Sequence, residues 1–397
     1  MRVNHIKARL ILVLLLLLLC CSASAQDFVP LSIGSTGDEV LAVKRRLYEL
    51  DYIRTDKLTR QYTDDTVGRI KRFQQANGLP ETGVVDAQTY DVLFSDSAKK
   101  APHPTMQPVC TPAPLPEPDW PERDAEGYLA GDGEYFYEND KDGLWAYLSQ
   151  DLQVTIVRRQ DSRLSLEWFE TEILTRNDEA LRTVVTDTKN LTRGYRYPEE
   201  FAQKQRFVLG FSDDFFADRI DKKQTVGVIV RNGEILRNQT QKQSKGHLPY
   251  LDMMAQYPDG SLMVYDWNEY SAQELVDMGA INVFCFGPWL IRDGEINEVI
   301  YEFYKSIEPR HALGMIEPGH YFLLSIEGRN KYSNGTTLQR VAEMMKAHGV
   351  TQALNLDGGN TLALVFHGKM LNHMAIYDGK EFIRRVNSMI GVGCYEK

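Results

Sequence analysis

The stretch ALNLDGGNT occupies residues 353–361 and joins an apolar strand to an abrupt polar turn. Its first four residues predict a buried strand, and Asp357 follows directly, with two glycines after it. Glycines in such a place let the backbone approach a ligand closely and turn its N–H groups outward. Because Asp-Gly is also a common turn signal, this stretch alone predicts either a catalytic carboxylate beside amide donors or a plain hairpin turn.

The residues around this stretch, 131–395, mix strand and helix patterns without a regular βαβ rhythm. The run at 281–286 reads as a strand, and a capping box at Ser271 opens a short helix before it. Apolar residues at i, i+3, i+4 and i+7 predict a further helix within 338–349, ending at a glycine. The mixture predicts a large α+β domain.

A second, smaller unit is predicted over residues 28–97. Apolar spacing indicates three short helices, the second opened by a cap at Thr63 and the third by Asp86. Three short helices around one core form a small bundle, which by itself is compatible with almost any function.

Particular stretches of this unit carry more information than its helical pattern. They are GSTGDEV at 34–40, FQQANGLP at 73–80 and TGVVD at 82–86. In this order they resemble the peptidoglycan-binding domain 1 family over the whole unit. The resemblance implies a non-catalytic cell-wall anchor whose partner is peptidoglycan.

The first 25 residues have the character of a secretory signal peptide. Three basic residues precede an apolar run from Leu10 to Leu19, and an Ala-x-Ala end predicts cleavage after Ala25. A transmembrane anchor is the alternative, but it needs about 20 apolar residues. A proline-rich linker is predicted over 98–124, because prolines at that density favour extended, semi-rigid backbone.

Composition narrows the classes of function. The 397 residues are 43% hydrophobic and 25% charged, which excludes a disordered, collagen-like or multi-span membrane protein. The net charge is −10, and losing Arg2, Lys7 and Arg9 with the signal leaves −13. Such an acidic chain is not expected to bind nucleic acid or anionic lipid as its main partner. Secretion without a disulfide framework indicates a bacterial cell-wall or extracellular location.

Several motifs of the large unit, taken together, resemble the phosphodiester glycosidase family over residues 193–392. The resemblance rests on FSDDFF at 211–216, FGPWLI at 286–291, PRHALG at 309–314, SIEGR at 325–329, the DGG turn at 357–359 and RVNS at 385–388. It implies a hydrolase of sugar-1-phosphodiesters. Residue by residue, it predicts Asp357, Asp214 and Glu327 as catalytic candidates, and Arg310, Arg329, His311, Ser333, Asn355, Gly358, Gly359, Asn360 and Thr361 as residues that bind substrate or phosphate.

Elementary chemistry agrees with these roles. A phosphate leaving group is a weak base, so it needs charge neutralisation more than protonation, and arginine offers a planar fork to its oxygens. Arg310 and Arg329 are the candidates, with an ordinary ion pair as the alternative role for each. Attack on an oxocarbenium-like carbon then needs one carboxylate, with Asp357 as the first choice. His311 either shares a proton with substrate or is a structural residue.

No cofactor is firmly implied. The cysteines and histidines lack the spacing of zinc ligands. Oxygen ligands have no recognisable spacing, so the sequence is also compatible with a hard cation such as calcium bound to Asp214, Asp357 and Asn355. The sequence therefore predicts a secreted, wall-anchored hydrolase of sugar-1-phosphodiesters in envelope or capsular polymers. The alternative is a wall- or glycan-binding protein with a degenerate glycosidase domain; a peptidoglycan hydrolase is supported only by the anchor.

Overall fold

The computed structural model of the chain describes residues 28–50, 52–53, 58–101, 119–176, 181–214, 216–239, 251–303 and 305–395. The expected signal peptide and most of the expected linker, residues 102–118, lie outside the described residues. The chain divides into two compact units, residues 1–105 and 106–397. In the described part of the chain, no helix is long and apolar enough to cross a membrane.

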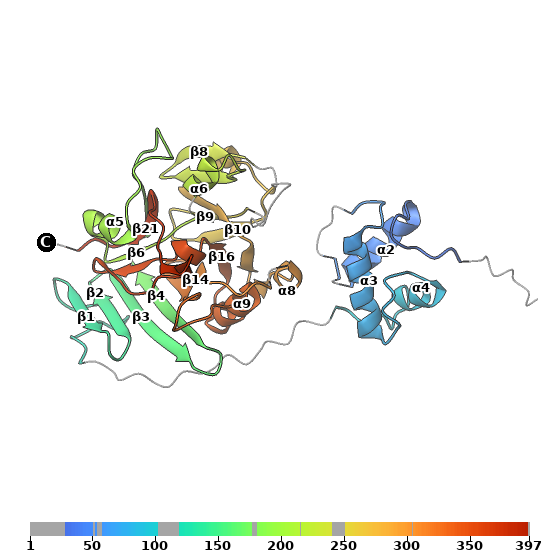
Figure 1. The fold of residues 1–397 in the computed structure, drawn as a ribbon, viewed down its shortest axis with the longest axis horizontal. Helices are drawn as coiled ribbons and strands as arrows, with labels where there is room; N and C mark the ends of the chain where they lie inside the picture. The colour runs from blue at the N-terminus through green and yellow to red at the C-terminus, as the bar shows by residue number, and fades with distance from the viewer. Residues whose placement is uncertain are drawn as a thin grey trace, which may run out of the picture. The chain divides into compact units, whose positions relative to one another are not determined.

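The first unit is the predicted helical bundle (Figure 1). Its helices are α2 (Asp38–Glu49), α3 (Asp64–Asn77) and α4 (Ala87–Leu93). Thr63 and Thr66 form the capping box that opens α3, and Gly78 ends it in the left-handed conformation at φ 71°. Asp86 caps α4 by accepting a hydrogen bond from Thr89 N–H at 2.8 Å.

One apolar core holds these three helices together. Val40, Val43, Ile70 and Phe73 are fully buried in it, at the positions where the helical spacing placed one apolar face. Burying each such side chain stabilises the fold by roughly 1.5–3 kcal/mol. Ala101 belongs to the same core, and its backbone N–H donates to Leu50 O at 2.8 Å. Residues beyond the last helix therefore also belong to the core of this unit.

The second unit is an α+β domain built on three antiparallel sheets, as the sequence predicted. Its strands are β1 (Tyr135–Asn139), β2 (Leu144–Leu148), β3 (Leu152–Asp161), β4 (Leu166–Thr175), β5 (Leu181–Val185), β6 (Leu209–Phe211), β7 (Val228–Arg231), β8 (Glu234–Asn238), β9 (Asp252–Gln256), β10 (Leu262–Tyr265), β11 (Asn282–Phe286), β12 (Trp289–Arg292), β13 (Glu295–Ile296), β14 (Arg310–Glu317), β15 (His320–Ile326), β16 (Gln352–Leu356), β17 (Leu364–Phe366), β18 (Lys369–Met370), β19 (Ile376–Tyr377), β20 (Lys380–Glu381) and β21 (Ser388–Val392). Short helices α5 (Pro198–Gln205), α6 (Phe216–Asp221), α7 (Ala272–Asp277), α8 (Val299–Phe303) and α9 (Leu338–Ala347) lie between them.

The largest sheet has nine strands in the order β1-β2-β3-β4-β15-β14-β16-β12-β13. Its long members β3 and β4 run side by side in Figure 1, and β15 pairs with β4 so that Ile326 lies opposite Trp168. Two five-stranded sheets accompany it, in the orders β10-β9-β11-β7-β8 and β18-β17-β6-β21-β5; β19 and β20 form a separate hairpin. Strand order thus brings together segments that are far apart in the sequence.

Apolar side chains from the three sheets form one central core. Phe169, Phe211, Met254, Leu354 and Ile390 belong to it, although they come from five different strands. On another part of the nine-stranded sheet α9 packs through its predicted apolar face against β12, β14 and β15. These layers fix the ends of β6, β15 and β16, and the predicted carboxylates Asp214, Glu327 and Asp357 lie just beyond these three ends.

Candidate active site

The candidate site begins at the turn that follows β16. Asp357 is the first residue after this buried strand, and its backbone N–H donates to Asp213 O at 3.2 Å. That contact joins the end of β16 to the end of β6, in a different sheet. The side chain of Asp357 is 15% exposed, so the carboxylate is largely desolvated but still open to a reactant.

The two glycines of this turn allow a close approach between backbones. A Cβ on Gly358 would overlap Pro309 O, at the start of β14. Gly359 has φ 60°, and a Cβ there would lie 2.5 Å from Arg329 Nη2. A larger residue at Gly358 would therefore push the turn away from the backbone of β14, whereas one at Gly359 would displace the Arg329 guanidinium and strain a left-handed backbone.

A hydroxyl and a guanidinium flank the Asp357 carboxylate. Arg384 Nη1 lies 3.8 Å from Asp357 Oδ2 and donates to Thr361 Oγ1 at 3.2 Å. Arg384 is itself placed by its backbone N–H, which donates to Asn360 O at 2.9 Å. The side chain of Arg384 is 36% exposed, so its fork reaches both the carboxylate and solvent. This arrangement can hold an anionic group beside Asp357.

A second arginine acts on Asp357 from the interior. Arg219 in α6 is 2% exposed, and its Nη2 donates to Cys285 O at 2.6 Å. Its buried Nε and Nη1 have no hydrogen-bond partner among the described residues. Burial raises the pKa of Asp357 to about 6, while the charges of Arg384 and Arg219 and a hydrogen bond from Thr361 lower it in part.

Arg329 is the predicted phosphate ligand that the structure places at this turn. Its guanidinium lies beside Gly359, and its Nε lies 3.4 Å from Glu308 Oε2. Both side chains of this ion pair are more than a third exposed, so solvent screens it and a bound anion can compete with Glu308. With Arg384 and Arg219, Arg329 surrounds the turn with positive charge in an acidic protein.

Arg310 and His311 lie at the start of β14 and point elsewhere. Arg310 donates from Nε to Thr336 O at 3.1 Å and from Nη2 to Ser306 O at 2.6 Å. His311 is fully buried, with Nδ1 3.0 Å from Ser325 Oγ, and burial lowers its pKa to about 3. A neutral imidazole in this place is a structural partner of β15; phosphate binding by either residue stays a prediction.

Asp214 is held away from solvent by an ion pair. It is fully buried, accepting from Arg231 Nη2 at 2.7 Å and from Cys285 N–H at 2.8 Å. Its neighbour Phe215 lies outside the described residues. Both carboxylate oxygens of Asp214 thus have partners, and among the predicted carboxylates Asp357 is better placed for chemistry.

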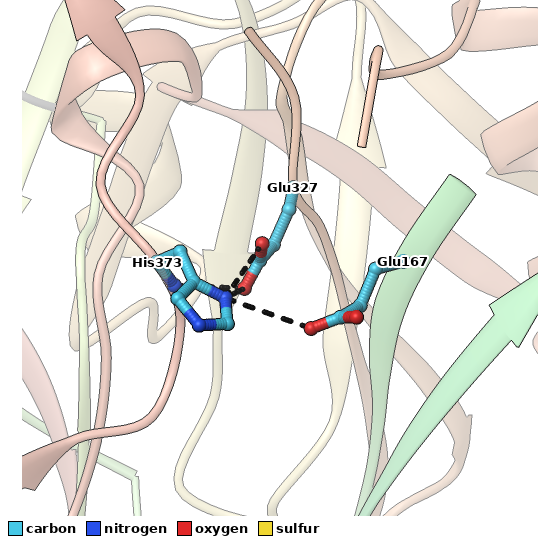
Figure 2. Close-up of side chains that lie close together, drawn as sticks. All are labelled: Glu167, Glu327 and His373. Carbon is cyan, nitrogen blue, oxygen red and sulfur yellow. Dashed lines mark hydrogen bonds and ion pairs between the residues drawn. The ribbon is translucent and has the colours of Figure 1, made fainter. Parts of the chain in front are cut away.

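The third predicted carboxylate, Glu327, follows β15 and is fully buried. It accepts hydrogen bonds from Asn330 Nδ2 at 3.0 Å and from His373 N–H at 2.7 Å. Ser333 Oγ donates to the Glu327 carbonyl at 2.7 Å, which closes the intervening loop. Figure 2 shows Glu327 turned toward Glu167 and His373, two residues that sequence reasoning did not single out.

Two predicted asparagines use their amides on the backbone. Asn355 Nδ2 donates to Gly287 O at 2.8 Å. Asn360 Nδ2 donates to Ala375 O at 3.2 Å and to Phe382 O at 3.0 Å, so it ties the segment before Arg384 to the glycine turn. The structure thus brings Asp357, Gly358, Gly359, Thr361 and Arg329 together, with Asn360 supporting them.

Sequence reasoning missed Arg384 and Arg219. Arg384 directly precedes the RVNS motif at 385–388, and two adjacent arginines in an acidic chain are its only sequence signal. Arg219 had no signal at all, since it lies in a short helix whose neighbours are ordinary polar and apolar residues. Both reach Asp357 only through tertiary packing.

The raised pKa of Asp357 predicts a pH dependence. If the carboxylate form acts, kcat/KM should fall about tenfold for each pH unit below about 6 and level off above it. Arg384→Met should move this limb to higher pH, because the lost positive charge no longer favours the carboxylate. Rates measured from about pH 4 to 8 check this; a rate that instead falls above about pH 6 would make Asp357 an acid.

Comparison with protein families confirms both resemblances. Residues 205–393 match the family described as phosphodiester glycosidase, and residues 36–93 match the family described as putative peptidoglycan binding domain. The chain thus carries a glycosidase-type domain and a wall-binding-type domain. The segment 205–393 holds Asp357, Thr361, Arg384, Arg219 and Arg329.

Among curated proteins, the SPbeta prophage-derived uncharacterized protein YomE of Bacillus subtilis strain 168 is 25% identical over 246 residues. The match covers 57% of this chain and 37% of that protein, so this chain spans little more than a third of its relative. Among solved structures, a similar one is the zebrafish N-acetylglucosamine-1-phosphodiester alpha-N-acetylglucosaminidase catalytic domain, auto-inhibited by its pro-peptide. Its sequence identity is 18% and its TM-score 0.48, and the match covers 66% of this chain and 88% of that one. A hypothetical protein from Synechocystis follows at 15% identity and 0.39, covering 62% of each chain.

Proposed function

We propose that this chain, which carries a phosphodiester glycosidase domain at 205–393, is a secreted bacterial hydrolase that cleaves sugar-1-phosphodiesters in envelope or capsular polymers. Its first unit holds it on peptidoglycan. The observation that carries this proposal is the Asp357 carboxylate, with Arg384 Nη1 3.8 Å away and Thr361 hydrogen-bonded to the same guanidinium. One carboxylate beside guanidinium groups is what a phosphate leaving group requires.

In the proposed reaction the bond between the anomeric carbon and the phosphate oxygen breaks. The phosphate monoester leaves with the bonding electrons, and Arg384 and Arg329 balance its charge. Water supplies the hydroxyl that ends on the sugar and the proton that ends in solution or on phosphate. Asp357 either forms a transient ester with the anomeric carbon or takes the proton from the attacking water.

Release of free sugar tests this function. Purified protein is incubated with a sugar-1-phosphodiester, and reducing sugar and phosphate monoester are both measured. Equal release of the two products supports the hydrolase. Saturable binding of the same compound without release supports the alternative, a glycan-binding protein with a degenerate domain, and Asp214 sealed in its ion pair is the feature that favours that alternative.

Wall anchoring is expected to reside in the first unit alone. A fragment of residues 26–105 keeps the whole core, including Ala101, and should therefore fold and sediment with insoluble cell-wall sacculi. Binding is measured as the fraction of fragment removed from the supernatant. The fragment from residue 119 onward serves as the control and should stay in solution. A folded 26–105 fragment that also stays in the supernatant contradicts the anchor.

A further inference from the structure

Two buried glutamates and one histidine meet beside the candidate site, outside the machinery proposed above. Glu167 is the second residue of β4, Glu327 follows β15, and His373 lies between β18 and β19 (Figure 2). Pairing of β4 with β15 places the two glutamates side by side, and Glu327 N–H donates to Glu167 O at 3.1 Å. One oxygen or nitrogen from each residue lies within 4.8 Å of the others.

The distances within this trio suit a small metal ion. His373 Nδ1 lies 3.1 Å from each Glu327 oxygen and 3.6 Å from Glu167 Oε1. Four-coordinate zinc, with bonds of about 2.0–2.2 Å, holds its ligand atoms about 3.3 Å apart. The distances from His373 Nδ1 to the two carboxylates thus match this spacing, the ligand atoms of all three residues lie within 4.8 Å of one another, and the partly exposed His373 leaves a path for an ion from solvent.

One oxygen of the trio lacks a hydrogen bond among the described residues. Glu167 is 3% exposed, and no described residue donates a hydrogen bond to its buried Oε1, which points at His373. Its other oxygen accepts from Gln160 Nε2 at 2.8 Å. Two buried carboxylates whose oxygens lie within 4.8 Å of one another repel each other. A cation bound among the three groups would offset this repulsion and give Glu167 Oε1 a partner.

The surroundings orient these groups as the neighbours of metal ligands commonly do. Gln160 and Asn330 each donate to one of the carboxylates. The Tyr332 ring stacks on His373 with centroids 4.0 Å apart, which fixes the plane of the imidazole. In metal sites the ligating carboxylates and imidazoles are commonly held in place by neighbouring residues in this way.

We infer that Glu167, Glu327 and His373 bind a divalent transition-metal ion of the zinc class. The imidazole favours zinc over calcium or magnesium, which prefer sites made only of oxygen. Bound metal would fasten the segment around His373, whose Ala375 carbonyl also holds Asn360 of the glycine turn. This inference does not depend on the proposed hydrolysis.

Zinc titration of the full chain tests the site. Protein stripped with a chelator is titrated with zinc chloride in a calorimeter, and its melting temperature is recorded with and without zinc. Native protein should bind one zinc ion per chain and melt at a higher temperature with it. Glu167→Gln and His373→Gln should each weaken binding by about a hundredfold or more, because each removes a ligand.

His320→Gln is the matched control, because His320 Nε2 contacts a single carboxylate, Glu172 Oε1, at 2.7 Å in another part of the sheet. It should bind zinc as the native protein does. Stoichiometric zinc that persists in both ligand variants, or folded native protein that binds none, overturns the proposal. Tighter binding of calcium than of zinc overturns the metal class.

Discussion

Asp357→Asn is expected to reduce sugar release from a sugar-1-phosphodiester by about a hundredfold or more, with the fold retained. The side chain changes little in shape, yet the position loses the negative charge that lies 3.8 Å from Arg384 Nη1. An amide can neither attack the anomeric carbon nor take a proton from water. The measurement is the initial rate of product release, paired with a thermal melt.

Asp378→Asn is the matched control for this change. Asp378 lies in the exposed turn between β19 and β20, and its left-handed backbone at φ 50° suits asparagine. This variant should keep the native rate. The melting temperature of Asp357→Asn should stay near the native value, because burial already disfavours the charged form of Asp357. Native turnover by Asp357→Asn would make Asp357 an ordinary turn residue.

Arg384→Lys should produce the second large loss, about ten- to a hundredfold in kcat/KM for the phosphodiester. Lysine keeps the charge but loses the planar fork that reaches Thr361 Oγ1 while lying 3.8 Å from Asp357. The loss should be selective for substrates that leave as phosphate. An aryl glycoside of the same sugar, if it is cleaved, should be affected little, and phosphate should inhibit the variant less than the native protein.

Arg385→Lys provides the control one residue further on. The Arg385 guanidinium lies over the Tyr197 ring, 6.0 Å from its centroid, and not at the glycine turn. The same substitution at Arg385 should leave kcat/KM unchanged for both the phosphodiester and the aryl glycoside. Equal losses on the phosphodiester and the aryl glycoside would mean that Arg384 supports the fold of the site and does not hold phosphate.

The local elements of this protein were readable from its sequence, because their signals are local. Thr63 and Asp86 begin helices as predicted, and the capping box at Ser271 opens α7. Apolar spacing predicted α9, and the apolar run before Asp357 is β16. Each depends on contacts within about one turn of helix or one strand, so neighbouring residues suffice to specify them.

The glycine turn was also identified from sequence, and Asp357 remains the first catalytic candidate. The residues that surround Asp357 were harder to predict from the sequence. Arg310 lies in another motif of the same family resemblance, at 309–314, yet its guanidinium donates to Ser306 and Thr336. Arg384 and Arg219, which no motif singled out, are the residues whose positive charges lower the pKa of this carboxyl group. A motif places a residue on the chain, whereas the direction of its side chain depends on what packs against it.

Tertiary structure alone decided which charges meet. Glu167 reaches Glu327 because β4 pairs with β15, and Asp213 touches Asp357 because the ends of β6 and β16 adjoin across two sheets. These contacts join residues more than a hundred positions apart, so no spacing along the chain records them. Local sequence determined the strands, helices and caps, while burial of one shared apolar core determined the order of strands and, through it, the surroundings of each charge.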